Sequence, residues 1–265
     1  MYGICNLSII PGRAEPSDKS EMFTQVLFGE HFSILEDNDN WCLIRLAHDN
    51  YKCWVDKKQM VMVTESFIYD LYDYPVLADE IIYPAVKTSD SSEVNIILGS
   101  ALPMFDKGKF LIDGEEYSYS GSVVDCNSPI TESIVDFAYR YLNTPYLWGG
   151  RSPFGIDCSG FTQMAFRLCG IALPRDSSEQ AEQGSAVEWV EEAKEGDLAF
   201  FSKEAAGIIS HVGIVLVDID GDDGKFKVMH ASGKVRIDNL DQKGIYNLEK
   251  KAYSHYLIRL TRISL

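Results

Sequence analysis

The first quarter of the chain alternates short apolar runs with polar, turn-forming residues. The apolar runs are rich in aromatic and β-branched residues, and Gly, Asn or Asp separates them. This alternation predicts short β-strands joined by tight turns. The expected strands are residues 25–28, 32–35, 41–46 and 51–55. Strands of this length and spacing favour a small β-barrel over residues 1–63.

A weaker copy of this layout follows in residues 84–123. A Ser-Glu pair ahead of a glycine recurs there, at offsets of 72 and 70 residues. The two copies are Ser20-Glu21 before Gly29 and Ser92-Glu93 before Gly99. A repeat at a nearly constant period indicates a repeated structural unit, although unequal offsets do not establish a duplication. A second small β-barrel with its linker is therefore expected over residues 64–124.

The period of the apolar pattern changes at about residue 125. Apolar residues then recur at the spacing of one helical face. They are Ile134, Phe137, Ala138 and Tyr141. After a loop and a second helix, residues 197–262 return to strand-like runs. Helices followed by an antiparallel sheet predict an α+β domain over residues 125–265.

A glycine-rich turn at residues 149–160 leads into the second predicted helix. Phe161, Ala165 and Leu168 have the spacing of a buried helical face, and Cys158 lies at the helix start. Unpaired N–H groups and the positive end of the macrodipole favour a thiolate at this position. Cys158 is therefore the candidate nucleophile, and the alternative is a small buried hydrophobic residue.

Two histidines stand at the ends of neighbouring strand-like runs. His211 is near the start of the run 210–217, and His230 is near the end of the run 226–231. The Asp- and Gly-rich stretch between them predicts a hairpin turn. A hairpin brings the start of its first strand beside the end of its second, so the two imidazoles are expected to meet. One can then act as the base for a thiol while the other orients it.

The same acidic stretch offers a calcium-loop alternative. Asp218, Asp220 and Asp222 alternate as calcium ligands do. However, Asp223 stands where such a loop needs glycine, and Met229 stands where it needs a bidentate glutamate. No Cys-x-x-Cys or His-x-x-x-His spacing points to zinc. We therefore expect neither a metal nor another cofactor.

The composition limits which partners and which cellular compartment are expected. The chain has 265 residues, 46% hydrophobic content and a net charge of −16, which argues against nucleic acid or anionic membrane surfaces as partners. No secretory signal or membrane-spanning run is evident. Six cysteines without a framework of spacings fit a reducing compartment, with Cys42 and Cys53 as buried thiols rather than a bridge. We expect a monomeric cytoplasmic protein, or an exported one if a leader has been removed.

Six motifs in a fixed order resemble the NlpC-like cysteine peptidases of bacterial cell-wall metabolism. They are residues 144–150, 157–161, 173–177, 196–198, 211–214 and 230–232. The resemblance implies an α+β papain-like catalytic domain over residues 125–265. The N-terminal half is similar to the bacterial SH3-type domains fused to such enzymes, which implies two SH3-like β-barrels ahead of it. The resemblance also assigns Cys158 as nucleophile, His211 as general base and His230 as the residue that orients His211.

The two-barrel arrangement is similar to one group within this family, the γ-D-glutamyl-L-diamino acid endopeptidases or dipeptidyl-peptidases VI. The group hydrolyses the γ-D-glutamyl to diamino-acid bond of murein peptides that carry a free N-terminal L-Ala. A murein tripeptide is the implied substrate, and muropeptide recycling is the implied setting. The substrate-binding residues implied by motif position are Tyr51, Tyr146, Trp148, Asp157, Ser159, Asp176 and Ser177.

Several of these binding residues have a structural alternative. Asp157 and Asp176 are suited to capping the helices that follow them. Tyr51 can belong to the barrel core, and its surroundings depart from the group's Asp-Gly-Tyr-x-Gly-Trp pattern at Asn50 and Cys53. Asparagine tolerates left-handed backbone nearly as well as glycine does, so Asn50 is the milder departure.

Two other functions are compatible with the sequence. The enzyme can act on intact peptidoglycan with the barrels as wall anchors, or the chain can bind wall fragments without catalysis. Such binding proteins usually lack the cysteine or one of the histidines, whereas Cys158, His211 and His230 are all present. A peptidase is therefore the favoured interpretation.

Overall fold

The computed structural model describes residues 1–71, 75–128, 130, 132–205, 207–218, 226–247 and 250–264. Residues 219–225, which carry most of the calcium-loop alternative, lie outside the described residues. The chain divides into two compact units. Unit 1 comprises Met1–Thr131 and Trp148–Pro153, and unit 2 comprises Glu132–Leu147 and Phe154–Leu265. The segment Trp148–Pro153 therefore groups with the N-terminal unit, although its neighbours on both sides belong to unit 2.

The first part of unit 1 is a seven-stranded antiparallel sheet around a small apolar core, with the strand order β3-β2-β6-β5-β4-β1-β7. The strands are β1 Tyr2–Ile4, β2 Ile9–Arg13, β3 Met22–Leu27, β4 His31–Asp37, β5 Trp41–Leu46, β6 Lys52–Asp56 and β7 Val61–Val63, with a 3-10 turn at Lys57–Gln59. Alternate residues of β5 (Cys42, Ile44 and Leu46) are buried in the core. The strands predicted from the sequence are confirmed in β3, β4, β5 and β6.

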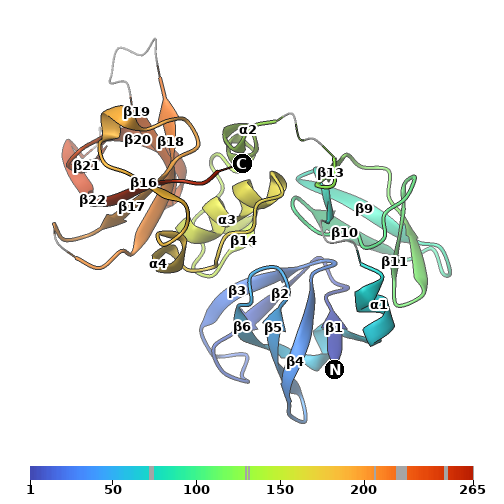
Figure 1. Ribbon diagram of the computed structural model, residues 1–265. Helices are drawn as coiled ribbons and strands as arrows, with labels where there is room; N and C mark the ends of the chain where they lie inside the picture. Colours follow the sequence, from blue (N-terminus) through green and yellow to red (C-terminus); the bar gives the residue numbers. More distant parts are fainter. Residues whose placement is uncertain are drawn as a thin grey trace. The chain divides into compact units, whose positions relative to one another are not determined.

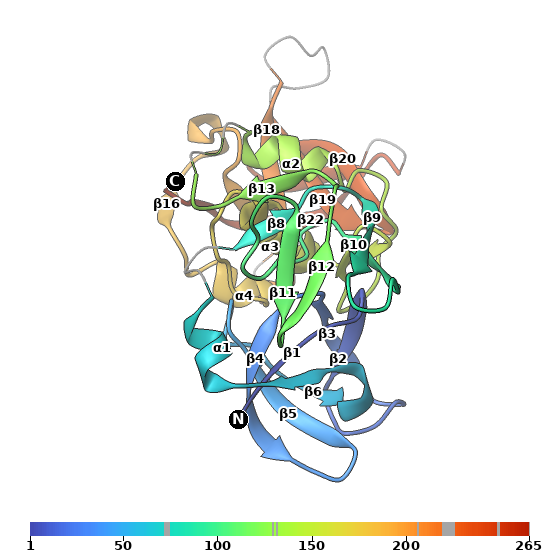
Figure 2. The ribbon, with the colours of Figure 1, turned by 90° about the vertical axis from the view of Figure 1, so that its right-hand side faces the viewer.

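The second part of unit 1 contains a four-stranded sheet, β10-β9-β12-β11, and the two-stranded pair β8–β13 (Figure 2). The elements are α1 Glu65–Tyr69, β8 Val76–Ala78, β9 Ile82–Lys87, β10 Glu93–Ile97, β11 Lys109–Ile112, β12 Glu115–Ser118 and β13 Val123–Asp125. The rings of Phe110 and Tyr117 stack at 5.0 Å, and Phe28 meets Phe110 edge-on at 5.5 Å. The two parts of unit 1 therefore share one aromatic core. That the second part is an SH3-type barrel stays a prediction.

Unit 2 combines a few short helices with a closed β-barrel (Figure 1). Its sheet has the order β16-β22-β17-β18-β19-β20-β21, and β21 also pairs with β22, which closes six strands into a ring. The elements are α2 Ile134–Tyr139, β15 Gly155–Ile156, α3 Cys158–Leu168, α4 Ser177–Gln180, β16 Ser185–Val187, a 3-10 turn at Val190–Glu192, β17 Leu198–Ser202, β18 His211–Val217, β19 Phe226–Ser232, β20 Lys234–Asp241, β21 Gly244–Asn247 and β22 Ala252–Arg262. The strand β14, Arg151–Ser152, belongs to unit 1.

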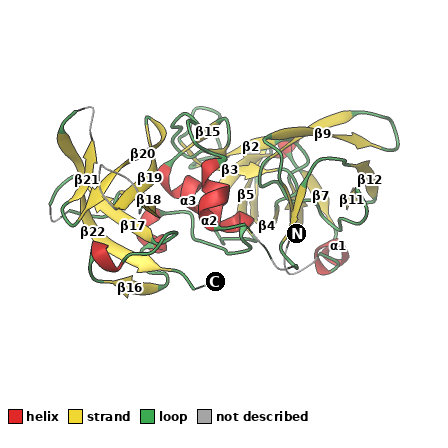
Figure 3. Ribbon diagram, turned by 90° about the horizontal axis from the view of Figure 1, so that it is seen from above, coloured by secondary structure: helices red, strands yellow, loops and turns green. Residues whose placement is uncertain are grey.

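The central helix α3 lies between α2 and the barrel strands β18 and β19 (Figure 3). Every residue of α3 except Arg167 is buried. Tyr141, which follows α2, meets Phe161 of α3 edge-on with ring centroids 6.4 Å apart. Helices and an antiparallel sheet are thus present as predicted, but strands outnumber helices more strongly than the sequence pattern suggested. Packing on both sides holds the first residue of α3 in one position.

Candidate active site

Cys158 is the first residue of α3, as the glycine-rich turn predicted. Asp157 caps the helix, because its Oδ1 accepts the backbone N–H of Gly160 at 2.7 Å. Cys158 itself is only 8% exposed. The backbone N–H groups of Ser159 and Val212 both hydrogen-bond to its sulfur. Val212 adjoins His211, so the helix start and the start of β18 meet at this point.

The hairpin of β18 and β19 brings the two predicted histidines together. The strands pair antiparallel with Gly213 opposite His230. His211 Nε2 and His230 Nδ1 are 2.7 Å apart, and both rings are buried. The juxtaposition that was inferred from an Asp- and Gly-rich stretch between two strand-like runs is therefore present.

The histidine pair continues into β20, which the sequence did not indicate. His230 Nε2 lies 3.1 Å from Asp238 Oδ2, and Arg236 Nε lies 2.9 Å from the same oxygen. Burial favours a raised pKa for Asp238, but hydrogen bonds from His230 and Arg236 outweigh it and lower the pKa. Asp238 is therefore an ionised acceptor, and nothing in its local sequence pattern marks it.

The charged Asp238 sets the tautomers of both histidines. A carboxylate only accepts, so His230 must donate from Nε2 and accept at Nδ1. His211 must then donate from Nε2 to His230. The remaining ring nitrogen of His211, Nδ1, carries a lone pair and can take a proton.

A third histidine covers the ring of His211. The ring of His255, from β22, stacks on the ring of His211 with centroids 4.4 Å apart and planes 16° apart. β22 reaches this place because it pairs with β17, which in turn pairs with β18. No local sequence pattern predicts this contact, because only closure of the barrel brings β22 beside the hairpin.

Burial holds the resting thiol and imidazole uncharged. It raises the pKa of Cys158 to about 12, and the neighbouring Asp157 adds to this rise. Burial, followed by the charges of His230, His255 and Lys203, lowers the pKa of His211 well below its usual value. The predicted preference for a thiolate at the helix start is thus not met, because desolvation outweighs the hydrogen bonds to the sulfur.

An arginine fixes two of the predicted binding residues. Arg175 Nη1 and Nη2 lie 3.0 and 2.5 Å from the two oxygens of Asp157, and Nη1 lies 2.9 Å from Ser159 Oγ. All three side chains are buried. The capping alternative for Asp157 is therefore observed, and its charge is already paired. A role for Asp157 and Ser159 in binding substrate stays a prediction.

The helix α4 holds the other predicted pair. Asp176 precedes α4 and Ser177 begins it, and the Asp176 side chain does not cap the helix. The buried Gln180 of α4 donates to Ser159 O at 3.0 Å and accepts from Thr162 Oγ1 at 2.7 Å. These bonds fasten α4 to the first turn of α3.

The three predicted aromatic residues have different surroundings. In unit 2, burial and then the charges of Cys158 and Asp157 raise the pKa of Tyr146 to about 12. In unit 1, Trp148 Nε1 donates to Glu21 Oε1 at 2.7 Å. Tyr51, also in unit 1, is partly buried against the barrel core. Asn50 before it has a φ of 60°, the left-handed conformation expected for this asparagine. The contribution of Tyr51 to binding stays a prediction.

Two further observations concern other kinds of site. Among the described residues, no group of three or more His, Cys, Asp or Glu side chains is arranged to hold a metal ion. None of the helices within the described ranges is both long enough and apolar enough to cross a membrane.

Comparison with known proteins agrees with this geometry. Residues 143–253 match the NlpC/P60 family, and residues 12–60 match the bacterial dipeptidyl-peptidase SH3 domain. The chain is 31% identical over 206 residues to the gamma-D-glutamyl-L-lysine dipeptidyl-peptidase of Bacillus subtilis strain 168, covering 72% of this chain and 68% of that protein. It is 27% identical over 265 residues to dipeptidyl-peptidase 6 of Lysinibacillus sphaericus, covering 87% and 88%.

A solved structure shows the same fold over almost the whole chain. The crystal structure of an NlpC/P60 family protein from Bacillus cereus ATCC 10987 superimposes with a TM-score of 0.80, covering 99% of each chain at 20% identity. At that identity the likeness concerns the fold alone.

Proposed function

Because the chain belongs to the NlpC/P60 family and is a cysteine-type peptidase, we propose that it cleaves the γ-D-glutamyl to L-diamino-acid bond of murein peptides. The substrate carries a free N-terminal L-Ala, and the products are L-Ala-D-Glu and the remainder that begins with the diamino acid. The names of the two relatives described above support this substrate class. A free L-Ala exists only after an amidase has cut the peptide from the glycan, so the reaction belongs to the recycling of released peptides.

The observation that carries the proposal is the ordered line from Asp238 through His230 to His211. It leaves His211 Nδ1 as the acceptor, and Val212, the next residue of β18, hydrogen-bonds to the Cys158 sulfur through its backbone N–H. A base with a fixed tautomer and a buried thiol at a helix start are the parts that thiol catalysis needs. A binding protein would have no use for this order.

The reaction begins with proton transfer from Cys158 to His211 as the sulfur attacks the γ-carbonyl. Because both groups are uncharged at rest, the charges form together and at close range, where their attraction offsets the cost of burial. The backbone N–H of Cys158 and the Tyr146 hydroxyl are the proposed oxyanion donors. One such donor typically contributes about 3–4 kcal/mol to the transition state.

His211 then returns its proton to the nitrogen of the departing diamino acid, and the C–N bond breaks. A thioester between Cys158 and L-Ala-D-Glu remains. Water, deprotonated by His211, attacks this thioester and releases the dipeptide with the thiol restored. His230 and Asp238 hold the imidazole and stabilise its charged form.

Asp176 is the stronger candidate partner for the substrate ammonium. Both oxygens of Asp157 are engaged by Arg175, and Oδ1 also caps α3. A second cation gains little from a carboxylate whose charge is already paired. Asp176 is an exposed residue directly before α4, next to Ser177, the first residue of that helix.

The test is mass spectrometry of L-Ala-γ-D-Glu-L-Lys and its N-acetylated form, incubated with the wild type and with Cys158→Ala. We expect the wild type to release L-Ala-D-Glu from the free peptide, and the variant to release none. The acetylated peptide should react far more slowly, because it lacks the ammonium that is proposed to pair with the Asp176 carboxylate. Equal cleavage of both peptides would contradict the requirement for a free N-terminal amine. Activity in Cys158→Ala would contradict the role of Cys158 as nucleophile.

A further inference from the structure

Lys203 directly follows β17, a strand of the active-site sheet. β17 runs between β18 and β22, with Phe201 opposite His211 on one side and Ser202 opposite Tyr256 on the other. Lys203 directly follows Ser202, so it leaves the sheet between the two strands that supply His211 and His255. Its side chain is exposed, and no carboxylate among the described residues forms an ion pair with it.

The Lys203 ammonium acts on both imidazoles. Its charge lowers the pKa of His211, after the larger effects of burial, His230 and His255. It also lowers the pKa of His255, which burial and His230 bring to about 4. The strand register agrees with this, because Lys203 directly follows the pairings of Phe201 with His211 and of Ser202 with Tyr256. The Lys203 charge makes His211 a weaker proton acceptor than the same ring would be without it.

The chemistry of the reaction says which part of the substrate comes to this side. His211 donates its proton to the leaving nitrogen, so the diamino acid must lie beside that ring. His255 covers one face of His211 and forms a wall there. In a released tripeptide the α-carboxylate of the diamino acid is free, and only the α-carbon separates it from the leaving nitrogen. The α-carboxylate of the leaving diamino acid should therefore lie near the Lys203 ammonium.

We propose that Lys203 binds the free α-carboxylate of the leaving amino acid, with His255 as the wall of that subsite. This assignment rests on the proposed function and makes it narrower, because it selects peptides that end at the diamino acid. A tetrapeptide, whose diamino acid continues into a further residue, has an amide at this position and leaves Lys203 unpaired. The bound carboxylate also neutralises the Lys203 charge that weakens His211 as a proton acceptor. A substrate with a free carboxylate therefore makes His211 a stronger base.

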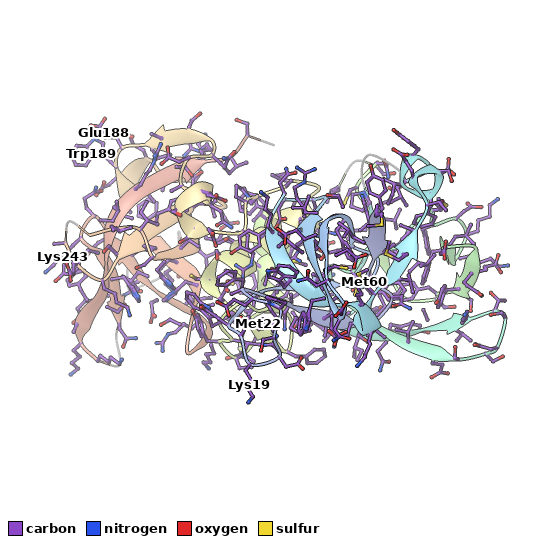
Figure 4. All side chains as sticks on the ribbon, turned by 90° about the horizontal axis from the view of Figure 1, so that it is seen from below. Lys19, Met22, Met60, Glu188, Trp189 and Lys243 are labelled. Atoms are coloured by element: carbon purple, nitrogen blue, oxygen red, sulfur yellow. The ribbon has the colours of Figure 1, made fainter. Side chains whose placement is uncertain are left out.

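The test compares L-Ala-γ-D-Glu-L-Lys as the free acid and as the C-terminal amide. L-Lys is used because it has no second carboxylate in its side chain. Each is assayed with the wild type, Lys203→Gln, Lys203→Arg and Lys243→Gln. Lys243 lies in the β20–β21 turn and stands over the ring of Tyr253, so its replacement removes the same charge from the same unit (Figure 4).

We expect the wild type to prefer the free acid by about tenfold in kcat/KM, the size of one modest charge-assisted contact. Lys203→Gln should bring this ratio close to one, mainly by slowing the free acid. Lys203→Arg and Lys243→Gln should keep the preference. Lys203 is exposed, so these variants should unfold at the wild-type temperature.

The outcomes separate the two claims. Cleavage of both peptides with a ratio that Lys203→Gln does not change would overturn the carboxylate subsite and leave the proposed function intact. Equal loss of the preference in Lys203→Gln and Lys243→Gln would also overturn it, since the effect would then be one of net charge. If the wild type cleaves neither peptide, the proposed function fails and the subsite fails with it.

Discussion

At the scale of single residues, Asp238 decides how the candidate site can work. It is not adjacent to the thiol, but it determines which nitrogen of His211 bears a proton. Without an acceptor-only partner, His230 can turn its proton toward His211, and the His211 proton then moves to the nitrogen that must stay open. Asp238 is thus a positioning residue that acts through two rings.

Asp238→Asn should lower kcat by about ten- to a hundredfold with little change in KM, because the amide can donate as well as accept and no longer fixes the tautomer. Steady-state kinetics on L-Ala-γ-D-Glu-L-Lys measure this. Asp241→Asn is the matched control, since Asp241 also lies on β20 but pairs with Tyr253. A rise in KM with unchanged kcat would assign Asp238 to substrate binding instead.

The pH dependence follows from the direction of the His211 shift. Burial lowers its pKa below the ordinary value of 6.5, so the ring stays neutral and able to accept a proton as the pH falls through 6.5. The acid limb of kcat/KM, which reports the free enzyme, should therefore have its midpoint well below pH 6.5. A pH–rate profile from pH 4 to 9 checks this, and a midpoint at or above 6.5 would contradict it.

At the scale of elements, the buried Arg175 joins the loop before α4 to the start of α3. Its guanidinium is the partner of Asp157 and of Ser159, which flank Cys158. The pair is fully enclosed, so its disruption leaves a carboxylate without charge compensation. The position of Cys158 thus depends on a residue from outside the helix.

Arg175→Met should destabilise the protein by about 3–5 kcal/mol, the usual cost of breaking a buried pair on one side. Urea unfolding followed by circular dichroism measures it. Arg259→Met is the control, because Arg259 and Glu182 form an exposed pair worth about 1 kcal/mol or less. Similar losses in the two variants would mean that the Arg175 pair is not effectively buried.

What could be predicted from the sequence divides by the range of the interaction. The start of α3 and the meeting of His211 with His230 follow from local patterns, a helical apolar repeat and a hairpin. Asp238 and His255 come from strands whose neighbours are decided only when the barrel closes. The pKa of Cys158 is raised rather than lowered as the helix start suggested, because a helix start is visible in a sequence and the depth of burial is not.

At the scale of the whole molecule, the chain passes between its two units more than once. The segment Trp148–Pro153 is part of unit 1, where Arg151 forms two hydrogen bonds with the carboxylate of Glu30, both at 2.9 Å. Gln25 accepts the Arg151 backbone N–H at 2.7 Å. The Arg151 side chain is completely buried. A truncation at the domain boundary predicted from the sequence, between residues 124 and 125, would therefore separate Arg151 from its partners.

Glu30→Gln should expose the bond after Arg151 to trypsin, because the buried guanidinium loses its counter-charge and the segment opens more often. Mass spectrometry of timed digests identifies the new fragment. Glu182→Gln, which frees the exposed Arg259, should leave the digestion pattern of the core unchanged. Resistance of Glu30→Gln equal to that of the wild type would show that other contacts hold the segment.

The uncharged resting state of Cys158 has a consequence for oxidative damage. Peroxide and simple alkylating agents attack thiolates, and a thiol whose pKa is raised to about 12 presents almost none at neutral pH. None of the six cysteines is in a disulfide, and only Cys126 and Cys169 are more than slightly exposed. Those two should therefore be modified by iodoacetamide before Cys158 is. Burial therefore protects Cys158, the proposed nucleophile, from these reagents. If the proposed function holds, selective inhibitors should carry an electrophile on an L-Ala-γ-D-Glu frame.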